Sequence, residues 1–215
     1  MIYDITQPLF ECEVYPGDSK PEKKRVQSIE EGDICNLTDI SLCVHNGTHV
    51  DAPLHFYKDG KGIDRIALEK FIGPAYVSIQ EGDVTAEDAG RILASAAAAG
   101  EGAQKRILIR GKATVTLEAA QVFAEAGVNL VGNESQTVGP EENPMAVHLV
   151  LLGAEVVLLE GIRLSGVPEG VYLLNCAPLR LTDTDGSPCR AVLMDIPEYR
   201  KEPFPGKREV PAGNY

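Results

Sequence analysis

The sequence has no tryptophan and few aromatic residues, which make up 6% of its 215 residues. Few side chains are therefore available to build an aromatic cage or to stack on bases. Basic residues are also scarce, with 20 Lys and Arg against 32 Asp and Glu, so the formal net charge is −12. Because nucleic-acid-binding surfaces need clustered basic residues, we expect no nucleic-acid partner.

Long hydrophobic runs are absent as well. The longest, such as residues 149–152 and 156–159, are far too short to cross a bilayer. The first residues lack the basic and apolar regions of a secretory signal, so we expect neither export nor a membrane partner. The five cysteines are an odd number, widely scattered and without a C-x-x-C pair. A disulfide scaffold is therefore not expected, and the cytoplasm is the predicted location.

The patterns that are present predict one α/β domain over residues 1–215, with a mixed sheet and about three helices. Helix caps and stops predict helices at residues 86–99, 117–126 and 144–153. Apolar runs predict buried strands at residues 75–79, 106–109, 128–131, 156–159, 171–176 and 191–196, and an alternating pattern predicts a half-buried strand at residues 40–44. Residues 197–215, rich in proline, glycine and charge, are expected to be disordered or to form an arm on a partner.

Histidine is the most informative residue type, because three of the four histidines lie within the segment HNGTHVDAPLH as His45, His49 and His55. A glycine and a proline in this segment disfavour a helix. We expect a turn at the Asn-Gly pair followed by extended chain, which would place His49, Asp51 and His55 on one face. The turn can bring His45 back toward them. The segment therefore predicts a metal site of nitrogen and oxygen ligands.

Two later residues are candidates for the same site. His148 lies in the third predicted helix between apolar neighbours, where a histidine can equally be an ordinary core residue. Glu160 ends the apolar run VVLLE, where it can point into solvent or, if buried, needs a partner such as a metal ion. The cluster around His49 gives both residues something to bind, which favours a shared metal centre.

The segment HNGTHVDAPLHF resembles the H-x-G-T-H-x-D-x-P-x-H-F signature of the metal-dependent cyclase-like hydrolases, which include bacterial kynurenine formamidase. The opening DITQPLFECEVYPGD is similar to the first segment of that family. The stretch LLGAEVVLLEGIRLSGVPEGVYLLNCAPLRL, which follows His148 after two residues, is similar to its second block. The resemblance covers nearly the whole chain. It implies an α/β swivelling domain of β/β/α type that forms a homodimer or homotetramer.

The resemblance also implies a role for each motif residue. His55 falls on a catalytic residue, and the metal ligands fall on His45, His49, Asp51, His148 and Glu160. The formamidase branch holds two Zn²⁺ ions, bridged by the equivalents of Asp51 and Glu160. Isatin hydrolases use one Mn²⁺ and tend to carry an amide in place of that glutamate. The chain is therefore expected to bind two Zn²⁺ ions, with Mn²⁺ as the alternative.

The chain departs from the family pattern at GNESQTVGP, residues 132–140, where Glu134 and Gly139 replace two acids usual in formamidases. We expect these changes to fall where the substrate pocket is shaped. An aryl substrate also needs apolar contacts, and without tryptophan the candidates are few. We predict Phe10 and Tyr15 as substrate-binding residues; Phe56 and Tyr57 are further candidates, with core packing favoured for Phe56.

The expected activity is metal-dependent hydrolysis of a small-molecule amide, N-formylkynurenine, to kynurenine and formate. Water activated at the metals would attack, and His55 would act as general acid and base. One alternative is a related hydrolase of another small amide, a lactone or a cyclic imide. A second is a metal-binding protein without turnover, which a non-ligating His55 argues against. An aldolase-like or dehydratase reaction is a weaker third. Because ligating imidazoles must be neutral, metal binding should weaken below about pH 6.

Overall fold

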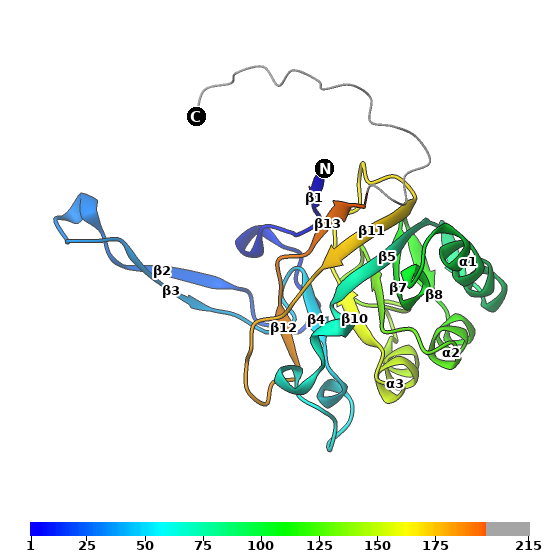
Figure 1. The fold of residues 1–215 in the computed structure, drawn as a ribbon. Helices are drawn as coiled ribbons and strands as arrows, with labels where there is room; N and C mark the ends of the chain where they lie inside the picture. Colours follow the sequence, from blue (N-terminus) through cyan, green and yellow to red (C-terminus); the bar gives the residue numbers. More distant parts are fainter. Residues whose placement is uncertain (197–215) are drawn as a thin grey trace.

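The computed structural model describes residues 1–196, in which a nine-stranded sheet has the order β1-β13-β11-β5-β7-β9-β10-β4-β12 (Figure 1). The central strands β5, β7, β9 and β10 run parallel to one another. The strands on either side of them are antiparallel to their neighbours. This is the mixed-sheet α/β fold that the sequence predicts; the proposed arm at 197–215 lies outside the described residues.

The sheet is built from β1 (Ile2–Asp4), β4 (His49–Asp51), β5 (Ile72–Ile79), β7 (Arg106–Arg110), β9 (Leu130–Asn133), β10 (Val157–Glu160), β11 (Gly170–Asn175), β12 (Gly186–Pro188) and β13 (Val192–Asp195). Two small sheets are formed by β2 (Glu22–Gln27) with β3 (Leu37–Ser41), and by β6 (Gly82–Val84) with β8 (Ala113–Val115). Short 3₁₀ helices are η1 (Leu9–Glu11), η2 (Ile29–Glu31), η3 (Pro53–His55), η4 (Ile63–Arg65), η5 (Leu68–Lys70) and η6 (Ala103–Lys105).

The three predicted helices are confirmed as α1 (Ala86–Ala99), α2 (Leu117–Glu125) and α3 (Met145–Gly153), and they gather on one side of the sheet (Figure 1). α1 begins with the predicted capping box, in which the Thr85 side chain accepts from Asp88 N–H and the Asp88 carboxylate accepts from Thr85 N–H. α3 begins one residue later than predicted, after Pro144. No helix within residues 1–196 is long and apolar enough to cross a membrane.

The parallel strands are apolar on both faces because each face is covered. Two apolar clusters cover the two faces of the sheet. Along β7, Ile107 and Ile109 belong to the cluster on the helix side, whereas Leu108 belongs to the cluster on the opposite side. In β10, Leu158 faces the helices and Leu159 the opposite cluster. Such strands have continuous apolar runs rather than an alternating pattern, which explains why the central strands were predictable from sequence.

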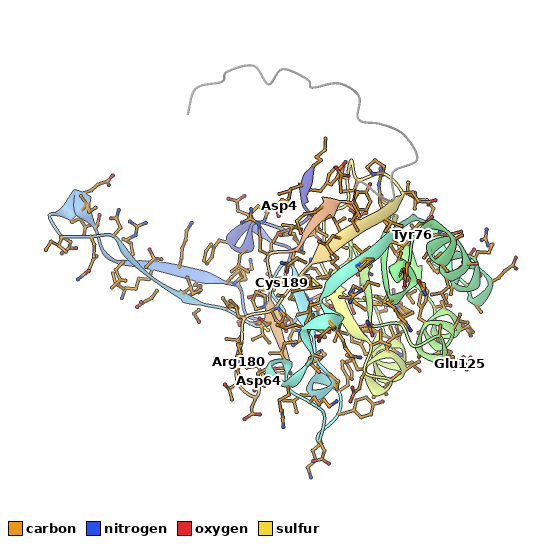
Figure 2. All side chains as sticks on the ribbon, viewed as in Figure 1. Asp4, Asp64, Tyr76, Glu125, Arg180 and Cys189 are labelled. Carbon is orange, nitrogen blue, oxygen red and sulfur yellow. The ribbon has the colours of Figure 1, made fainter. Side chains whose placement is uncertain are left out.

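The prediction of a half-buried strand at residues 40–44 is wrong. The strand there is β3, which ends at Ser41 and pairs only with β2 to form a two-stranded arm. The arm projects from the body of the protein, and its side chains extend from both faces (Figures 1 and 2). Every residue of β2 and β3 is exposed, because neither face of the arm packs against a further layer within residues 1–196.

The strand that carries the histidine motif, β4, lies between β10 and β12 and is antiparallel to both. Its central residue, Val50, is completely buried in the apolar cluster on the side away from the helices. Since side chains alternate along a strand, the flanking His49 and Asp51 point to the opposite side. The hydrophobic packing of Val50 therefore orients two of the predicted metal ligands.

Candidate metal centre

The centre begins with buried polar side chains on two adjacent strands. His49 and Asp51 of β4 are each 1% exposed, and Glu160 of β10 is 3% exposed. His49 lies directly opposite Glu160 in the antiparallel pairing, with its Nε2 3.3 Å from Glu160 Oε2 and 3.4 Å from Asp51 Oδ1. The alternative in which Glu160 points into solvent is therefore wrong, and the buried carboxylate faces the histidine motif.

His45 reaches the same place through the predicted turn. The backbone N–H of Asn46 donates to Cys43 O at 3.1 Å, and Gly47 then adopts a φ of 65°. A side chain at Gly47 would place its Cβ 3.3 Å from Cys12 Cβ, so glycine suits this position in both conformation and space. The turn returns the His45 ring to Asp51, with Nδ1 2.8 Å from Oδ1.

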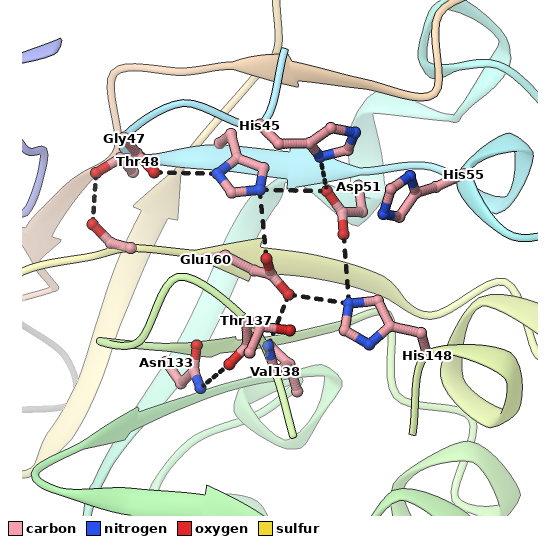
Figure 3. A network of polar contacts seen from close by, with 12 residues as sticks. His45, Gly47, Thr48, Asp51, His55, Asn133, Thr137, Val138, His148 and Glu160 are labelled. Carbon is pink, nitrogen blue, oxygen red and sulfur yellow. Dashed lines mark hydrogen bonds and ion pairs between the residues drawn. The ribbon is translucent and has the colours of Figure 1, made fainter. Parts of the chain in front are cut away.

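His148 enters the centre from α3. Its Nε2 lies 3.2 Å from Glu160 Oε1 and 3.7 Å from Asp51 Oδ2. The ring is 2% exposed, so it is buried like a core histidine, but it faces two carboxylates rather than apolar side chains alone. The structure thus brings together all five residues that the sequence predicts as metal ligands (Figure 3).

His55 approaches by a different route from the one predicted. Strand β4 ends at Asp51 and the chain stays extended through Ala52, after which η3 turns it through a 3₁₀ helix that ends at His55. Proline at the start of η3 is compatible with such a turn because its φ is already fixed near the helical value. The His55 ring still packs beside the His45 ring, with 4.2 Å between centroids, and its side chain remains 29% exposed.

Asp185 is the residue that the sequence analysis missed. It precedes β12, and its Oδ2 lies 2.7 Å from His45 Nε2 and 3.3 Å from His55 Nδ1. In the sequence it belongs to TDTDG, and an Asp-Gly pair is an ordinary turn signal. Nothing local distinguishes it from a surface turn, and only the pairing of β12 with β4 brings it to the histidines.

Each of the three proposed imidazole ligands has one ring nitrogen held away from the carboxylate pair. His49 Nδ1 contacts Gly47 O at 3.0 Å, His148 Nδ1 contacts Pro144 O at 3.0 Å, and His45 Nε2 contacts Asp185. The other nitrogen of each ring faces the carboxylates. Metal-binding histidines commonly have this arrangement, in which a hydrogen bond at one nitrogen fixes the tautomer that ligates through the other.

The residues fit a divalent metal ion. His49 Nε2 and Asp51 Oδ2 are buried and have no hydrogen-bond partner within residues 1–196, so both point into the space between the side chains. Two groups of donor atoms each lie within 4.8 Å of one another: His45 with Asp51 and His55, and His49 with Asp51 and Glu160. Imidazole and carboxylate donors suit Zn²⁺ and Mn²⁺ alike. Asp51 belongs to both groups.

The side chains shift one another's pKa values strongly. Burial lowers the pKa of His45, but its hydrogen bonds with Asp185 and Asp51 raise it by more, to about 11. Burial likewise lowers the pKa of His49, but its close contacts with the Asp51 and Glu160 carboxylates raise it by more, to about 9. The pKa of His148 is also raised, chiefly by Glu160 against the effect of burial. Without a metal ion, the imidazoles therefore hold protons that neutralise the buried carboxylates.

The carboxylates show the complementary effect. Burial raises the pKa of Asp51, but its contacts with the His45 and His49 rings bring it well below its ordinary value. Burial and the charge of Asp51 raise the pKa of Glu160, yet its contacts with the His148 and His49 rings leave it lowered. Both groups are therefore anionic at neutral pH and available to a cation.

A cavity of about 250 Å³ opens onto the centre, lined by Tyr15, Asp18, His45, His49, His55, Phe56, Gln136, Thr137, Pro144, His148 and Glu160. Tyr15 and Phe56 are thus placed to contact a ligand. Phe10 and Tyr57 do not line the cavity: Phe10 packs under Lys23 Nζ at 5.0 Å, and the Tyr57 hydroxyl donates to Leu149 O. Of the two predicted substrate-binding residues, the structure brings only Tyr15 to the cavity.

The segment at residues 132–140 divides between two places. Gln136 and Thr137 line the cavity at the histidines, as expected for a segment that shapes the pocket. Glu134 faces elsewhere, since its carboxylate accepts from the N–H groups of Gly111 at 2.7 Å and Leu164 at 2.9 Å. With Gly139 it borders a separate cavity of about 780 Å³, which contains none of the histidines.

Comparison with known proteins identifies the family. The family described as "Putative cyclase" matches residues 3–140, so the chain belongs to this family. A kynurenine formamidase from Erythrobacter litoralis (strain HTCC2594) is 32% identical over 214 residues, covering 92% of this chain and 95% of the relative. The family resemblance inferred from the motifs is confirmed.

Solved structures agree on the fold. A protein described as a potential metal-dependent hydrolase with cyclase activity superposes with a TM-score of 0.73 at 27% identity, covering 90% of this chain and 96% of the other. Isatin hydrolase A from Labrenzia aggregata superposes with a TM-score of 0.74 at 23% identity, covering 90% and 93%. At that identity the second likeness concerns the fold alone.

The raised imidazole pKa values generate a prediction about metal binding. A protonated imidazole must lose its proton to ligate, so Zn²⁺ binding at pH 7.5 should release about one proton or more per ion. Affinity should rise with pH through about 9, where His49 becomes neutral without metal, and on toward about 11, where His45 does. Protons therefore compete with Zn²⁺ for the imidazoles at pH values well above 6, where competition by an ordinary histidine would end. Calorimetric titration in buffers of different ionisation enthalpy measures the protons released, and binding without proton release at pH 7.5 would contradict this expectation.

Proposed function

We propose that the chain is a metal-dependent hydrolase of a C–N bond other than a peptide bond, and that it converts N-formylkynurenine to kynurenine and formate. The observation that carries the proposal is the convergence of His45, His49, Asp51, His148 and Glu160 beside a cavity that His55 also lines. Relatives named kynurenine formamidase, similar over most of the chain, support the choice of substrate.

We propose two Zn²⁺ ions at this centre. Asp51 offers one oxygen toward His45 and His49 and the other toward His148. Glu160 similarly faces His49 through Oε2 and His148 through Oε1. Each carboxylate therefore lies between two sets of imidazoles and would be within reach of an ion held by either set. A single Mn²⁺ is the alternative occupant.

The chemistry divides between the metal and the protein. A divalent metal bound here would lower the pKa of a water molecule toward about 7 and polarise a carbonyl group. His55 is suited to move protons because its Nδ1 is held by Asp185, which leaves Nε2 without a hydrogen-bond partner in the described residues. It would take a proton from the attacking water and give one to the departing aryl amine as the amide C–N bond breaks. Formate and the free amine are the products.

The cavity favours a small substrate. Its volume of about 250 Å³ is near the lower end of small-molecule sites. Tyr15 and Phe56 supply aromatic surface, and Gln136 and Thr137 supply polar groups on the wall formed by the substituted segment. A cyclic amide such as isatin is the second candidate, supported by the fold shared with isatin hydrolase A.

Two substitutions separate a ligand from a proton-transfer residue. His49→Ala removes a buried imidazole, so metal content and activity should fall together. His55→Ala should retain the metal while kcat falls roughly 100- to 10,000-fold, the usual contribution of a general acid–base. Metal analysis of each purified variant, beside kinetics with Zn²⁺-loaded protein, makes the comparison. Loss of metal from His55→Ala as complete as from His49→Ala would show that His55 is a ligand, which its proximity to His45 and Asp51 permits.

The substrate is tested with Zn²⁺-loaded protein and N-formylkynurenine, by following kynurenine absorbance. We expect turnover that a chelator abolishes and Zn²⁺ or Mn²⁺ restores. Tyr15→Ala should raise KM roughly tenfold, equivalent to about 1.4 kcal/mol of lost contact. Phe10→Ala, its matched control outside the cavity, should leave KM unchanged. If N-formylkynurenine is hydrolysed only at the background rate while isatin or a lactone is opened rapidly, the formamidase assignment is wrong. The second candidate, hydrolysis of a cyclic compound, then takes its place.

We also propose a cytoplasmic homo-oligomer, joined through the arm of β2 and β3. The arm exposes large apolar side chains on a two-stranded ribbon, namely Val26, Ile29, Ile34, Leu37 and Ile40. An isolated ribbon of this kind is at best marginally stable in water, so a covering surface on a second copy accounts for it. The five cysteines are free, as expected of a protein in a reducing compartment.

The oligomer is tested by light scattering coupled to size-exclusion chromatography. Wild type should run as a dimer or tetramer, and Ile40→Asp should shift it toward monomer because a charge would be buried in the contact. Asp39→Asn, the neighbouring exposed residue on the same strand, is the control that should leave the assembly intact. A wild-type protein that remains monomeric at micromolar concentration would rule out the proposal.

A further inference from the structure

Asp185 is placed at the centre by the backbone. Gly186 of β12 pairs with Asp51 of β4, and the Asp185 carbonyl accepts from Ala52 N–H at 2.9 Å. Thr184, the preceding residue, donates its hydroxyl to Gly186 O at 3.0 Å. These bonds fix the main chain without using the Asp185 side chain. The carboxylate is therefore free to make contacts of its own.

One oxygen of that carboxylate contacts two histidines. Oδ2 of Asp185 lies 2.7 Å from Nε2 of His45 and 3.3 Å from Nδ1 of His55. The two rings stack at 4.2 Å between centroids with an interplanar angle of 35°. The rings belong to a proposed metal ligand and to the proposed acid–base residue. A single oxygen atom thus joins the two functions of the centre.

The contact decides which nitrogen of His45 can ligate. Nδ1 faces Asp51 at 2.8 Å, on the side of the carboxylate pair, so it must carry the lone pair if His45 binds metal. The ring proton then sits on Nε2, where Asp185 accepts it. A carboxylate in this place orients the ring and makes the ligating nitrogen more basic.

The same carboxylate oxygen determines which nitrogen of His55 is available for proton transfer. With Nδ1–H donating to Asp185, Nε2 is the nitrogen left for proton transfer. His55 needs this help because its side chain is 29% exposed and sits at the end of a short 3₁₀ helix. The hydrogen bonds from His45 and His55 also hold the pKa of the Asp185 carboxyl well below its usual range, so the acceptor stays charged.

Gly186 supports the arrangement. A Cβ at this position would lie 2.9 Å from His45 Cε1, closer than side chains allow. The His45 ring therefore occupies space that only glycine leaves open, directly beside Asp185. The Asp-Gly pair, which in the sequence looks like a simple turn, provides both the acceptor and the room for the ring.

We propose that Asp185 is a positioning residue that orients His45 for metal binding and His55 for proton transfer through one shared carboxylate oxygen. The part that concerns His55 rests on the proposed hydrolase function, whereas the part that concerns His45 requires only metal binding. Asp185 does not itself line the cavity, whereas His45 and His55 do, so it acts through these two rings.

The test compares Asp185→Asn with Asp183→Asn. Both remove one acid from the same loop, but Asp183 pairs with Arg65 at the surface, and its φ of 55° is one that asparagine tolerates. Competition against a chelator should show Zn²⁺ affinity falling roughly 10- to 100-fold in Asp185→Asn only. Affinity within twofold of wild type would overturn the role at His45. This measurement needs no substrate, so it stands even if N-formylkynurenine is not hydrolysed.

Kinetics at saturating Zn²⁺ test the role at His55. Asp185→Asn should lower kcat with little change in KM, and it should add little to the loss already caused by His55→Ala, because both act on one proton transfer. Additive losses in the double variant would overturn this role. Asp185→Ala serves as a second variant, and thermal unfolding of the metal-free proteins checks that each remains folded.

Discussion

Asp51 and Glu160 are two carboxylates on adjacent strands, and almost no solvent reaches either of them. Removing such charges from water costs several kcal/mol per ion unless nearby groups compensate. Three imidazoles supply the compensation, either as cations or as neutral ligands around a metal ion. The turn before β4 and the start of α3 deliver imidazoles to this pair, and the loop before β12 delivers the carboxylate that holds one of those imidazoles. The electrostatic demand of two buried carboxylates is thus the condition that the surrounding chain satisfies.

That demand also explains why proton and metal binding are linked. The imidazoles are held near the carboxylates by bonds at their far nitrogens, so they cannot turn away when they lose a proton. A metal ion that binds here would find the imidazoles already oriented. Its positive charge would take the place of the charge of the imidazole protons. Little rearrangement is needed, because the ligand strand is fixed by Val50 in the core and by pairing on both sides.

The parts of the fold that local sequence controls were predictable. α1 follows from Thr85 and Asp88 at its start, and the central strands follow from apolar runs that are buried on both faces. The placement of the histidine motif was equally predictable, because the spacing of His49 and Asp51 alone puts them on one face. Glu160 follows from what a buried carboxylate requires, and His148 follows because the motif gives it something to bind. The family resemblance then assigned these residues to one metal site.

What escaped prediction depends on pairing between distant segments. Asp185 reaches the centre only because β12 lies beside β4, and no local pattern encodes that register. The arm strand was misjudged because alternation alone does not say whether a layer will cover it. Phe10 lies in the opening segment that resembles the family, but its ring packs beside Lys23 and outside the cavity. Glu134 was expected to shape the pocket, yet it holds two backbone N–H groups outside it.

The order of the donors along the chain has a consequence for biosynthesis. His45, His49 and Asp51 leave the ribosome first, His148 and Glu160 follow about a hundred residues later, and Asp185 leaves last. A nascent chain that has only its first histidines cannot form the carboxylate pair or the neighbouring strands. It therefore offers scattered weak ligands rather than a site. Selective metal loading must wait until the chain has been translated through β12, which can then pair with β4.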